Sequence, residues 1–298
     1  MDQASTLRYM SKMNENTNSS QQKRDKQIMV MAITSGKGGV GKTNIVANLA
    51  ISLSMLNRRV VVFDADLGLA NLDVLLGLIP KYNLKDVLIG KKSFSEIIVE
   101  GPKGIKIIPA SSGIQELSAL TDEQRLRLLS EFDQFDENID ILLIDTAAGI
   151  SSNVMYFNVA AQEIIVIAAP EPTSITDAYA LMKVLSINYG EKYFRLIVNS
   201  VKDEKEGKEV FKKLSVAADR FLDISIDYLG SIPFDESVTK AVRQQKALVE
   251  LYPSSKAGRS FAALAKSISK ISPRTHPKGN IQFFWQQILQ NHMNLKKE

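Results

Sequence analysis

A nine-residue glycine-rich segment, SGKGGVGKT at 35–43, carries the clearest chemistry in the chain. An apolar run precedes it and an apolar helix-like pattern follows it, which is the strand–loop–helix setting of a phosphate-binding loop. Its glycines allow backbone N–H groups to turn toward a phosphate, and the start of the following helix adds positive potential. We therefore expect ATP and Mg²⁺ as ligands. The residues predicted to form the loop are Gly36, Lys37, Gly38, Gly39, Val40, Gly41, Lys42, Thr43 and Asn44.

Four side chains in and beyond this loop have the chemistry to handle phosphate and metal. Lys42 brings an ammonium group to phosphate oxygens, and the Thr43 hydroxyl is suited to Mg²⁺. Asp64 and Asp145 each end an apolar run, and open parallel sheets place their ligands at the ends of strands. Carboxylates beside a triphosphate repel it unless a cation intervenes, so acids beside a strand end imply a bound metal ion. Helix capping and loop solvation are the alternative roles for Asp64. For Asp145 the alternative is a strand-terminal aspartate followed by a helix cap.

Short apolar runs alternate with longer helix-like stretches along most of the chain. The runs are continuous rather than interrupted by polar residues, which indicates strands buried on both faces in a parallel sheet. We therefore predict an α/β fold with a mostly parallel sheet and helices on both faces, in a single domain over 28–272. The runs expected to form strands lie at 28–33, 60–63, 105–108, 141–144, 164–169 and 195–198.

Composition narrows the class of protein. The chain of 298 residues has no cysteine, which excludes disulfides, thiolate catalysis and cysteine-held metal sites and fits a reducing compartment. Neither a secretory leader nor an apolar run long enough to cross a bilayer is visible, so we expect a cytoplasmic protein. The net charge is +4, but the part from Lys256 onward holds eight Lys or Arg and one acid, so it carries +7 and the rest −3. A basic tail favours a local anionic partner over a surface that coats nucleic acid.

The two ends of the chain differ from its middle. Apolar residues at helical spacing over 1–13 predict a short helix, and the polar segment 14–27 predicts a flexible linker. Over 273–298, apolar and aromatic residues recur at three- and four-residue spacing, which predicts an amphipathic helix containing Trp285. Aromatic rings and nearby lysines suit such a helix to an anionic membrane surface. Docking of the same face on the protein itself or on a partner is the alternative.

An extra lysine within the loop, Lys37, gives the segment KGGVGKT a likeness to one family. It resembles the deviant Walker A loop of the MinD/ParA ATPases, and FDADLGLANLD at 63–73 and ILLIDTAAGI at 141–150 are similar to that family's two switch segments. The resemblance implies ATP hydrolysis in a homodimer in which Lys37 reaches the phosphates of the other subunit. It also implies that Asp64 and Asp145 support the Mg²⁺ ligated by Thr43, the two acids through water, and that Asp66 orients the attacking water. Helix capping or loop solvation is the alternative role for Asp66. The expected catalytic residues are therefore Lys37, Lys42 and Asp66. A solvated surface lysine is the alternative for Lys37.

Two later segments are similar to strand ends that bind the adenine base in this family. Asn199 follows the apolar run RLIV, and GSIPFDE covers 230–236. The resemblance implies that Asn199 and the chain near Pro233 and Asp235 contact adenine, although Asn and Pro also simply end strands. One position departs from the family, because Asn44 stands where most relatives have Thr or Ser. An amide or the backbone N–H then has to replace the hydroxyl contact to the α-phosphate.

The N-terminal segment DQASTLR at 2–8 resembles the opening pattern of one branch of the family, the flagellar-number regulators of the FlhG, YlxH or FleN type. In that branch the segment binds and stimulates FlhF, a GTPase of the signal-recognition-particle type. The resemblance therefore implies FlhF and components of the flagellar basal body or C-ring as partners. A frayed terminus without a partner is the alternative. The residues that carry the match are Asp2, Gln3, Ala4, Leu7 and Arg8.

Together these features predict a slow regulatory ATP hydrolase that dimerises on ATP, associates with the cytoplasmic face of the membrane and regulates flagellar number or placement. A DNA-partitioning ATPase of the ParA type is the main alternative; it predicts salt-sensitive DNA binding, against which the −3 charge before Lys256 argues. A ligase that uses the same phosphate loop is another alternative, and it needs a small-molecule pocket. The absence of cysteine excludes a metal-cluster carrier, and no helix-turn-helix pattern points to a transcription regulator.

Overall fold

The structure is a computed structural model, and it describes residues 28–66, 71–109, 121, 124, 127, 131 and 139–271. The expected N-terminal helix at 1–13, its linker at 14–27 and the amphipathic helix at 273–298 lie outside the described residues. Part of the first expected switch segment, 67–70, lies outside them as well.

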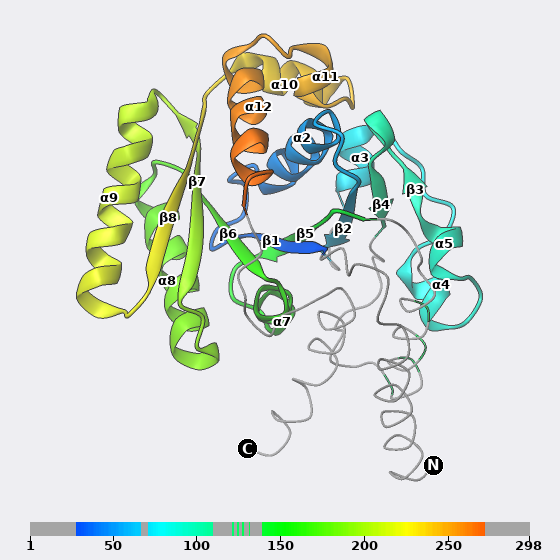
Figure 1. The fold of residues 1–298 in the computed structure, drawn as a ribbon, viewed down its shortest axis with the longest axis horizontal. Helices are drawn as coiled ribbons and strands as arrows, with labels where there is room; N and C mark the ends of the chain where they lie inside the picture. The colour runs from blue at the N-terminus through cyan, green and yellow to red at the C-terminus, as the bar shows by residue number, and fades with distance from the viewer. Residues whose placement is uncertain are drawn as a thin grey trace.

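A single twisted sheet runs through the centre of the molecule (Figure 1). Its order is β3-β4-β2-β5-β1-β6-β7-β8, and every neighbouring pair is parallel except β3 with β4. The strands are β1 (Met29–Ser35), β2 (Val60–Ala65), β3 (Val99–Glu100), β4 (Lys106–Ile108), β5 (Ile141–Ala148), β6 (Glu163–Ala168), β7 (Tyr193–Val201) and β8 (Ser225–Pro233).

Most of the connections between parallel strands contain helices. The α-helices of the described residues are α2 (Lys42–Ser54), α3 (Leu72–Leu76), α4 (Leu84–Leu88), α5 (Phe94–Ile97), α7 (Ser152–Ala160), α8 (Pro172–Tyr189), α9 (Glu204–Phe221), α10 (Glu236–Arg243), α11 (Leu248–Leu251) and α12 (Lys256–Ile268). A 3₁₀ turn, η1 (Pro102–Gly104), precedes β4. A parallel sheet requires such connections, because the chain must return to the same end of the sheet before the next parallel strand begins.

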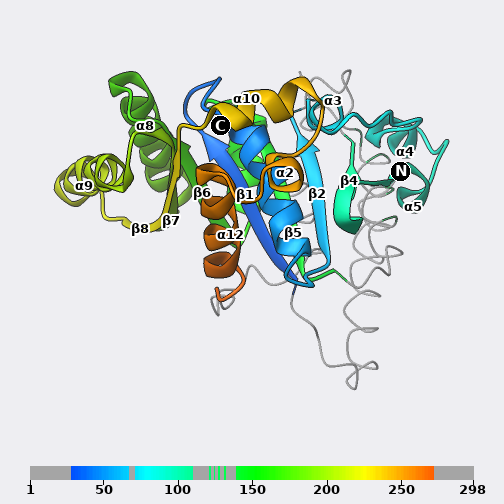
Figure 2. The same cartoon turned by 90° about the horizontal axis from the view of Figure 1, so that it is seen from above.

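Helices cover both faces of the sheet, as Figures 1 and 2 show. Successive residues of β1 enter different cores: Met31 packs in the cluster that contains α2 and α12, whereas Ala32 packs in the cluster that contains α7. On the α7 face the ring of Phe63 from β2 meets Phe157 edge-on, with 5.5 Å between ring centroids. Burial on both faces explains why the central strands have continuous apolar sequences.

The predicted fold class is confirmed: the sheet is mostly parallel and lies between helices. All six apolar runs lie on strands, namely β1, β2, β4, β5, β6 and β7, with ends shifted by a few residues. The sequence reasoning did not include β3 or β8 among these runs. β8 is an edge strand with one fully buried residue, Ile232, so its sequence lacks a continuous apolar run.

Candidate functional site

The predicted phosphate-binding loop connects β1 to α2 at the carboxyl end of the sheet. β1 ends at Ser35, and α2 begins at Lys42 after an N-cap glycine, Gly41, with φ +85°. Gly39 also has a positive φ, +79°. Only glycine adopts such angles without strain, so the glycines shape the loop before α2. The N–H groups of the first helical turn have no partner within the helix, which makes this end of α2 suited to an anion.

Two glycines of the loop are fixed by close contacts rather than by backbone angles alone. A Cβ at Gly36 would lie 2.1 Å from the carbonyl oxygen of Asp177 in α8, so any side chain there would push the helix away. A Cβ at Gly41 would lie 2.5 Å from Nδ2 of Asn199. By contrast, a Cβ at Gly38 or Gly39 would meet no atom within 4 Å, so this part of the loop borders open space.

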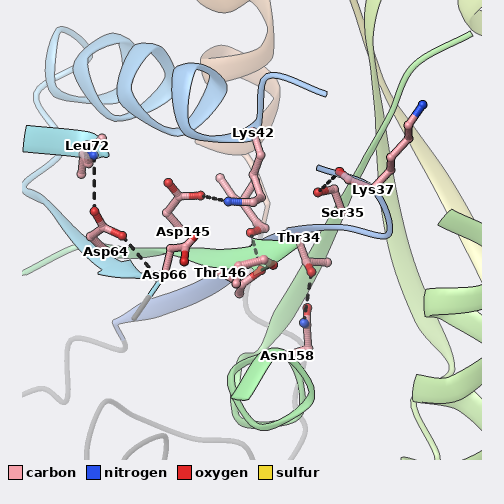
Figure 3. A network of polar contacts seen from close by, with 12 residues as sticks. Thr34, Ser35, Lys37, Lys42, Asp64, Asp66, Leu72, Asp145, Thr146 and Asn158 are labelled. Atoms are coloured by element: carbon pink, nitrogen blue, oxygen red, sulfur yellow. Dashed lines mark hydrogen bonds and ion pairs between the residues drawn. The ribbon is translucent and has the colours of Figure 1, made fainter. Parts of the chain in front are cut away.

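Lys42 and Asp145 form a buried ion pair beneath the loop (Figure 3). Nζ of Lys42 donates to Oδ1 of Asp145 at 2.5 Å, from α2 to the strand β5. Burial raises the pKa of Asp145 above its ordinary value, while the Lys42 ammonium and a hydrogen bond from Thr43 oppose that rise. The structure thus brings together three residues that the sequence singled out separately.

Asp64 lies beside this pair at the end of β2. Its Cα is directly in register with that of Asp145 on the neighbouring strand β5. Its Oδ1 accepts from the backbone N–H of Asp66 at 3.2 Å, and its Oδ2 from that of Leu72 at 3.3 Å. Burial raises the pKa of Asp64 to about 7, and repulsion from Asp145 adds to the rise. The start of α3 is therefore held to the strand end by a carboxylate that would gain from a nearby cation.

The donor set fits Mg²⁺ bound with a nucleotide. The buried carboxylate of Asp145 is paired with the Lys42 ammonium, whereas the buried carboxylate of Asp64 beside it accepts from backbone N–H groups. A divalent cation would offset the negative charge that Lys42 leaves unbalanced. Carboxylate and hydroxyl oxygens are the ligands that Mg²⁺ prefers, and Thr43 stands next to Lys42 in the first turn of α2. Among the described residues, no group of three or more His, Cys, Asp or Glu forms a metal site by itself. Phosphate oxygens would therefore have to complete the coordination.

Lys37, the extra lysine of the loop, points away from Lys42 (Figure 3). Its Nζ donates to Oε2 of Glu171 at 2.8 Å and to Oγ1 of Thr173 at 2.9 Å, at the start of α8. The Ser35 hydroxyl donates to the Lys37 carbonyl oxygen at 3.0 Å and so fixes the backbone at this point. Sequence reasoning missed Glu171 and Thr173, because only the fold brings the start of α8 next to the loop.

Behind the loop, α7 is linked to β1 by buried polar side chains (Figure 3). Nδ2 of Asn158 donates to Oγ1 of Thr34 at 3.3 Å and to the carbonyl oxygen of Val154 at 2.7 Å. Thr146, directly after Asp145, donates through its hydroxyl to the carbonyl oxygen of Ile33 at 3.3 Å. These contacts join β1, β5 and α7 close to the loop, and the sequence reasoning had not identified them.

The residues expected near adenine are in part occupied by structural contacts. Nδ2 of Asn199 donates to the carbonyl oxygen of Val40 at 2.8 Å, which places this side chain against the loop. Asp235, just after Pro233 at the end of β8, accepts at 2.9 Å from the N–H of Ser237 and at 3.1 Å from that of Ala257. Burial alone would raise the pKa of Asp235, but these hydrogen bonds outweigh it and lower the pKa to about 2. The expected adenine contacts of all three residues stay predictions.

Comparisons with known proteins identify relatives over most of the chain. The family of the CobQ/CobB/MinD/ParA nucleotide binding domain matches residues 31–249. The antiactivator FleN of Pseudomonas aeruginosa is 46% identical over 264 residues, which is 89% of this chain and 94% of that protein. The flagellum site-determining protein YlxH of Helicobacter pylori is 36% identical over 263 residues, 87% of this chain and 89% of that protein.

The fold has a solved counterpart that contains a nucleotide. The septum site-determining protein MinD of Pyrococcus horikoshii, complexed with Mg-ADP, superposes with a TM-score of 0.64 at 25% identity and covers 82% of this chain and 96% of that one. The family match spans the loop, the strands β2 and β5 that bear Asp64 and Asp145, and the helices around them. The chain therefore belongs to the family of CobQ/CobB/MinD/ParA nucleotide-binding domains, and within it resembles the antiactivator FleN and the flagellum site-determining protein YlxH.

Proposed function

We propose that the chain is an ATP-dependent switch that regulates flagellar number or placement, with slow hydrolysis as its timer. The similarity to FleN, at 46% identity over nearly the full length of both proteins, carries this proposal. The similarity to YlxH, whose name states that it determines the flagellum site, points to the same process. No helix in the described part of the chain is long and apolar enough to cross a membrane.

In this proposal the loop from Gly36 to Asn44 binds the phosphates of ATP. The free N–H groups at the start of α2 and the Lys42 ammonium face the phosphate charge. Mg²⁺ supplies charge neutralisation at the phosphates when it is bound. Thr43, Asp64 and Asp145 hold it, and the buried position of both carboxylates supports this assignment. Asp66 lies directly after the end of β2 and orients the attacking water.

Lys37 acts across a homodimer in this proposal, on the phosphates bound to the other subunit. Its partners Glu171 and Thr173 lie at the start of α8, and the Lys37–Glu171 ion pair is exposed to solvent. An exposed ion pair is worth little, so exchanging Glu171 for a phosphate of a second subunit costs little. An added positive charge at a phosphate undergoing transfer acts like an arginine finger.

The two ends of the chain provide the outputs of the switch. We assign the segment 1–13 to the stimulation of the GTPase FlhF and the segment 273–298 to binding of an anionic membrane surface. Flagellar basal-body or C-ring proteins are the further partners in this proposal. Both segments lie outside the described residues, so the proposal for them rests on sequence similarity and helical patterning.

The decisive experiment compares Lys37→Met with Lys183→Met, which removes an exposed lysine of α8. Lys37→Met is expected to abolish ATP-induced dimerisation in size-exclusion chromatography with light scattering, and to lower ATP turnover by about a thousandfold or more. Affinity for ADP should stay unchanged, because Lys37 is not expected to contact the nucleotide of its own subunit. Lys183→Met should behave like the native chain. An equal loss of ADP affinity in Lys37→Met would contradict the role across the dimer.

The outputs need separate measurements. A peptide of residues 1–13 should raise the GTP turnover of FlhF, whereas a scrambled peptide should not. The full chain should sediment with vesicles that contain anionic lipid only with ATP, and a chain ending at 272 should stay in the supernatant. Failure of the native chain to bind ATP would remove the whole proposal. Failure of FlhF stimulation would remove its flagellar part and leave the ATPase part standing.

A further inference from the structure

A short chain of side-chain amides connects the phosphate-binding loop to α11. Asn44 lies in the first turn of α2, next to Thr43, and Asn48 lies one turn later. Asn48 is fully buried between α2 and α11. Its Nδ2 lies 2.8 Å from the carbonyl oxygen of Asn44 and 3.0 Å from Oδ1 of the same residue, and its Oδ1 lies 3.0 Å from the backbone nitrogen of Val249.

The orientation of both amides follows from two backbone groups whose roles cannot change, the N–H of Val249 and the carbonyl oxygen of Asn44. The backbone N–H of Val249 can only donate, so the Asn48 atom that faces it must be the oxygen. The Asn48 NH₂ group then faces Asn44 and can only donate. The Asn44 side-chain atom that receives this bond must therefore be Oδ1.

The contact with Asn48 determines which group Asn44 can offer to a ligand. With its oxygen engaged by Asn48, the Asn44 amide has its NH₂ group left to offer to a ligand. Phosphate oxygens accept hydrogen bonds and do not donate them, so an outward NH₂ group is attractive and an outward amide oxygen is repulsive. A free asparagine could present either group, because rotation of its amide exchanges them.

We propose that Asn48 is a positioning residue of the nucleotide site: anchored on the Val249 N–H, it holds the Asn44 amide so that its NH₂ group donates to the α-phosphate. The inference rests on the proposed nucleotide-binding function of the loop. It explains how an asparagine can replace a hydroxyl residue after Thr43. A hydroxyl can rotate to donate without help, whereas an amide needs a second residue to set its direction.

A purely structural role for Asn48 is the competing explanation, since the same side chain also joins α11 to α2. The two roles differ when Asn44 is replaced by threonine. In an Asn44→Thr background the hydroxyl donates to phosphate on its own, and Asn48 keeps the Asn44 carbonyl oxygen as an acceptor. Loss of Asn48 then harms packing in both backgrounds but harms phosphate binding only where residue 44 is an amide.

The test is a double-mutant cycle on the full chain with isothermal titration of Mg-ADP and Mg-ATP. In the native background, Asn48→Ala should weaken both nucleotides alike, by about tenfold or more, as expected for loss of a hydrogen bond to a charged group. In the Asn44→Thr background the same change should weaken them by less than about twofold, while thermal stability falls equally in both backgrounds. The inference is wrong if Asn48→Ala lowers the affinity in the two backgrounds by factors that agree within about twofold. Agreement of that kind is expected when residues 44 and 48 act independently.

A second variant covers the case in which Asn48→Ala does not fold. Asn48→Asp keeps an oxygen for Val249 and loses the donor toward Asn44. Its added negative charge repels the phosphates in both backgrounds, so the loss of affinity for both nucleotides should be about tenfold or more larger in the native background than in the Asn44→Thr background. Hydrogen exchange at the Val249 amide reports whether the link to α11 persists. If the native chain binds neither nucleotide, the proposed function itself fails and the inference with it. If it binds both and neither Asn48 variant distinguishes the backgrounds, the positioning role alone is wrong.

Discussion

The phosphate-binding loop carries two lysines whose surroundings differ sharply. Nζ of Lys42 lies 2.5 Å from a carboxylate oxygen of Asp145, with 8% and 1% of the two side chains exposed. Nζ of Lys37 lies 2.8 Å from a carboxylate oxygen of Glu171, with 37% and 63% exposed. Similar distances therefore hide different energies, because water screens the second pair and not the first. The buried pair therefore contributes to the stability of the folded chain, whereas Lys37 can exchange Glu171 for another anion at little cost.

The largest effect is expected when the ammonium of the buried pair is removed. Lys42→Met should lower the free energy of unfolding by about 3 kcal/mol, because it leaves the Asp145 carboxylate buried without its partner. Lys37→Met, the matched change on the same loop, should stay within about 0.5 kcal/mol of the native chain. Urea unfolding of the nucleotide-free proteins measures both.

A second substitution separates charge from packing. If an unpaired carboxylate causes the loss, Lys42→Met combined with Asp145→Asn should recover much of the stability, because no buried charge is then left. No recovery in the double variant, or an equal loss in Lys37→Met, would show that burial does not distinguish the two lysines in the way proposed.

How much of the fold the sequence could predict depends on local signals. β1, β2 and β5 lie in the middle of the sheet and are buried on both faces, so their apolar runs were visible without knowledge of their neighbours. β8 lies at the edge and all its residues except Ile232 are exposed or only partly buried, and β3 has only two residues, so neither gives a continuous apolar run. Pairing at an edge is decided by tertiary contacts rather than by sequence pattern.

The candidate site shows the same limit. The loop glycines, Lys42 and the aspartates Asp64 and Asp145 follow from the sequence, because the first belong to a recognisable motif and each aspartate directly follows an apolar run. The partner of Lys37 is 134 positions away, and the contact of Asn48 with Val249 spans 201 positions. Such contacts exist only once the sheet is assembled. Whether a residue near a motif binds a ligand or a neighbour is therefore beyond local sequence reasoning.

An intermediate case between the two lysine pairs is Asp235, which is partly exposed. Its two carboxylate oxygens accept backbone N–H groups at the starts of α10 and α12. Asp235→Asn keeps one accepting oxygen and loses the other, so it should lower the free energy of unfolding by about 1–2 kcal/mol at pH 7. Asp219→Asn, an exposed change on α9, is the matched control and should have no measurable effect.

The pH dependence of Asp235 sharpens this prediction. Its folded-state pKa of about 2 lies below the usual value of about 3.9 in unfolded chains. Stabilisation by the carboxylate is therefore complete above that usual value and is lost as the pH falls from about 4 toward about 2. The gap in unfolding free energy between the native chain and Asp235→Asn should narrow between pH 7 and pH 3. A gap that widens on acidification would contradict the assigned hydrogen bonds.

The smallest effect is expected at the exposed pair. Glu171→Gln removes the charge opposite Lys37 but keeps a hydrogen-bond acceptor. The free energy of unfolding, measured by thermal unfolding, should therefore change by no more than about 0.5 kcal/mol. Asp223→Asn breaks the Lys192–Asp223 pair, which is also exposed, and should give the same small change. A loss above about 1.5 kcal/mol in Glu171→Gln alone would mean that Lys37 is held as firmly as Lys42. Moving Lys37 from Glu171 to the phosphates of a second subunit would then need a further contact to offset the loss. A change of no more than about 0.5 kcal/mol in Glu171→Gln is therefore the result that the dimer proposal expects.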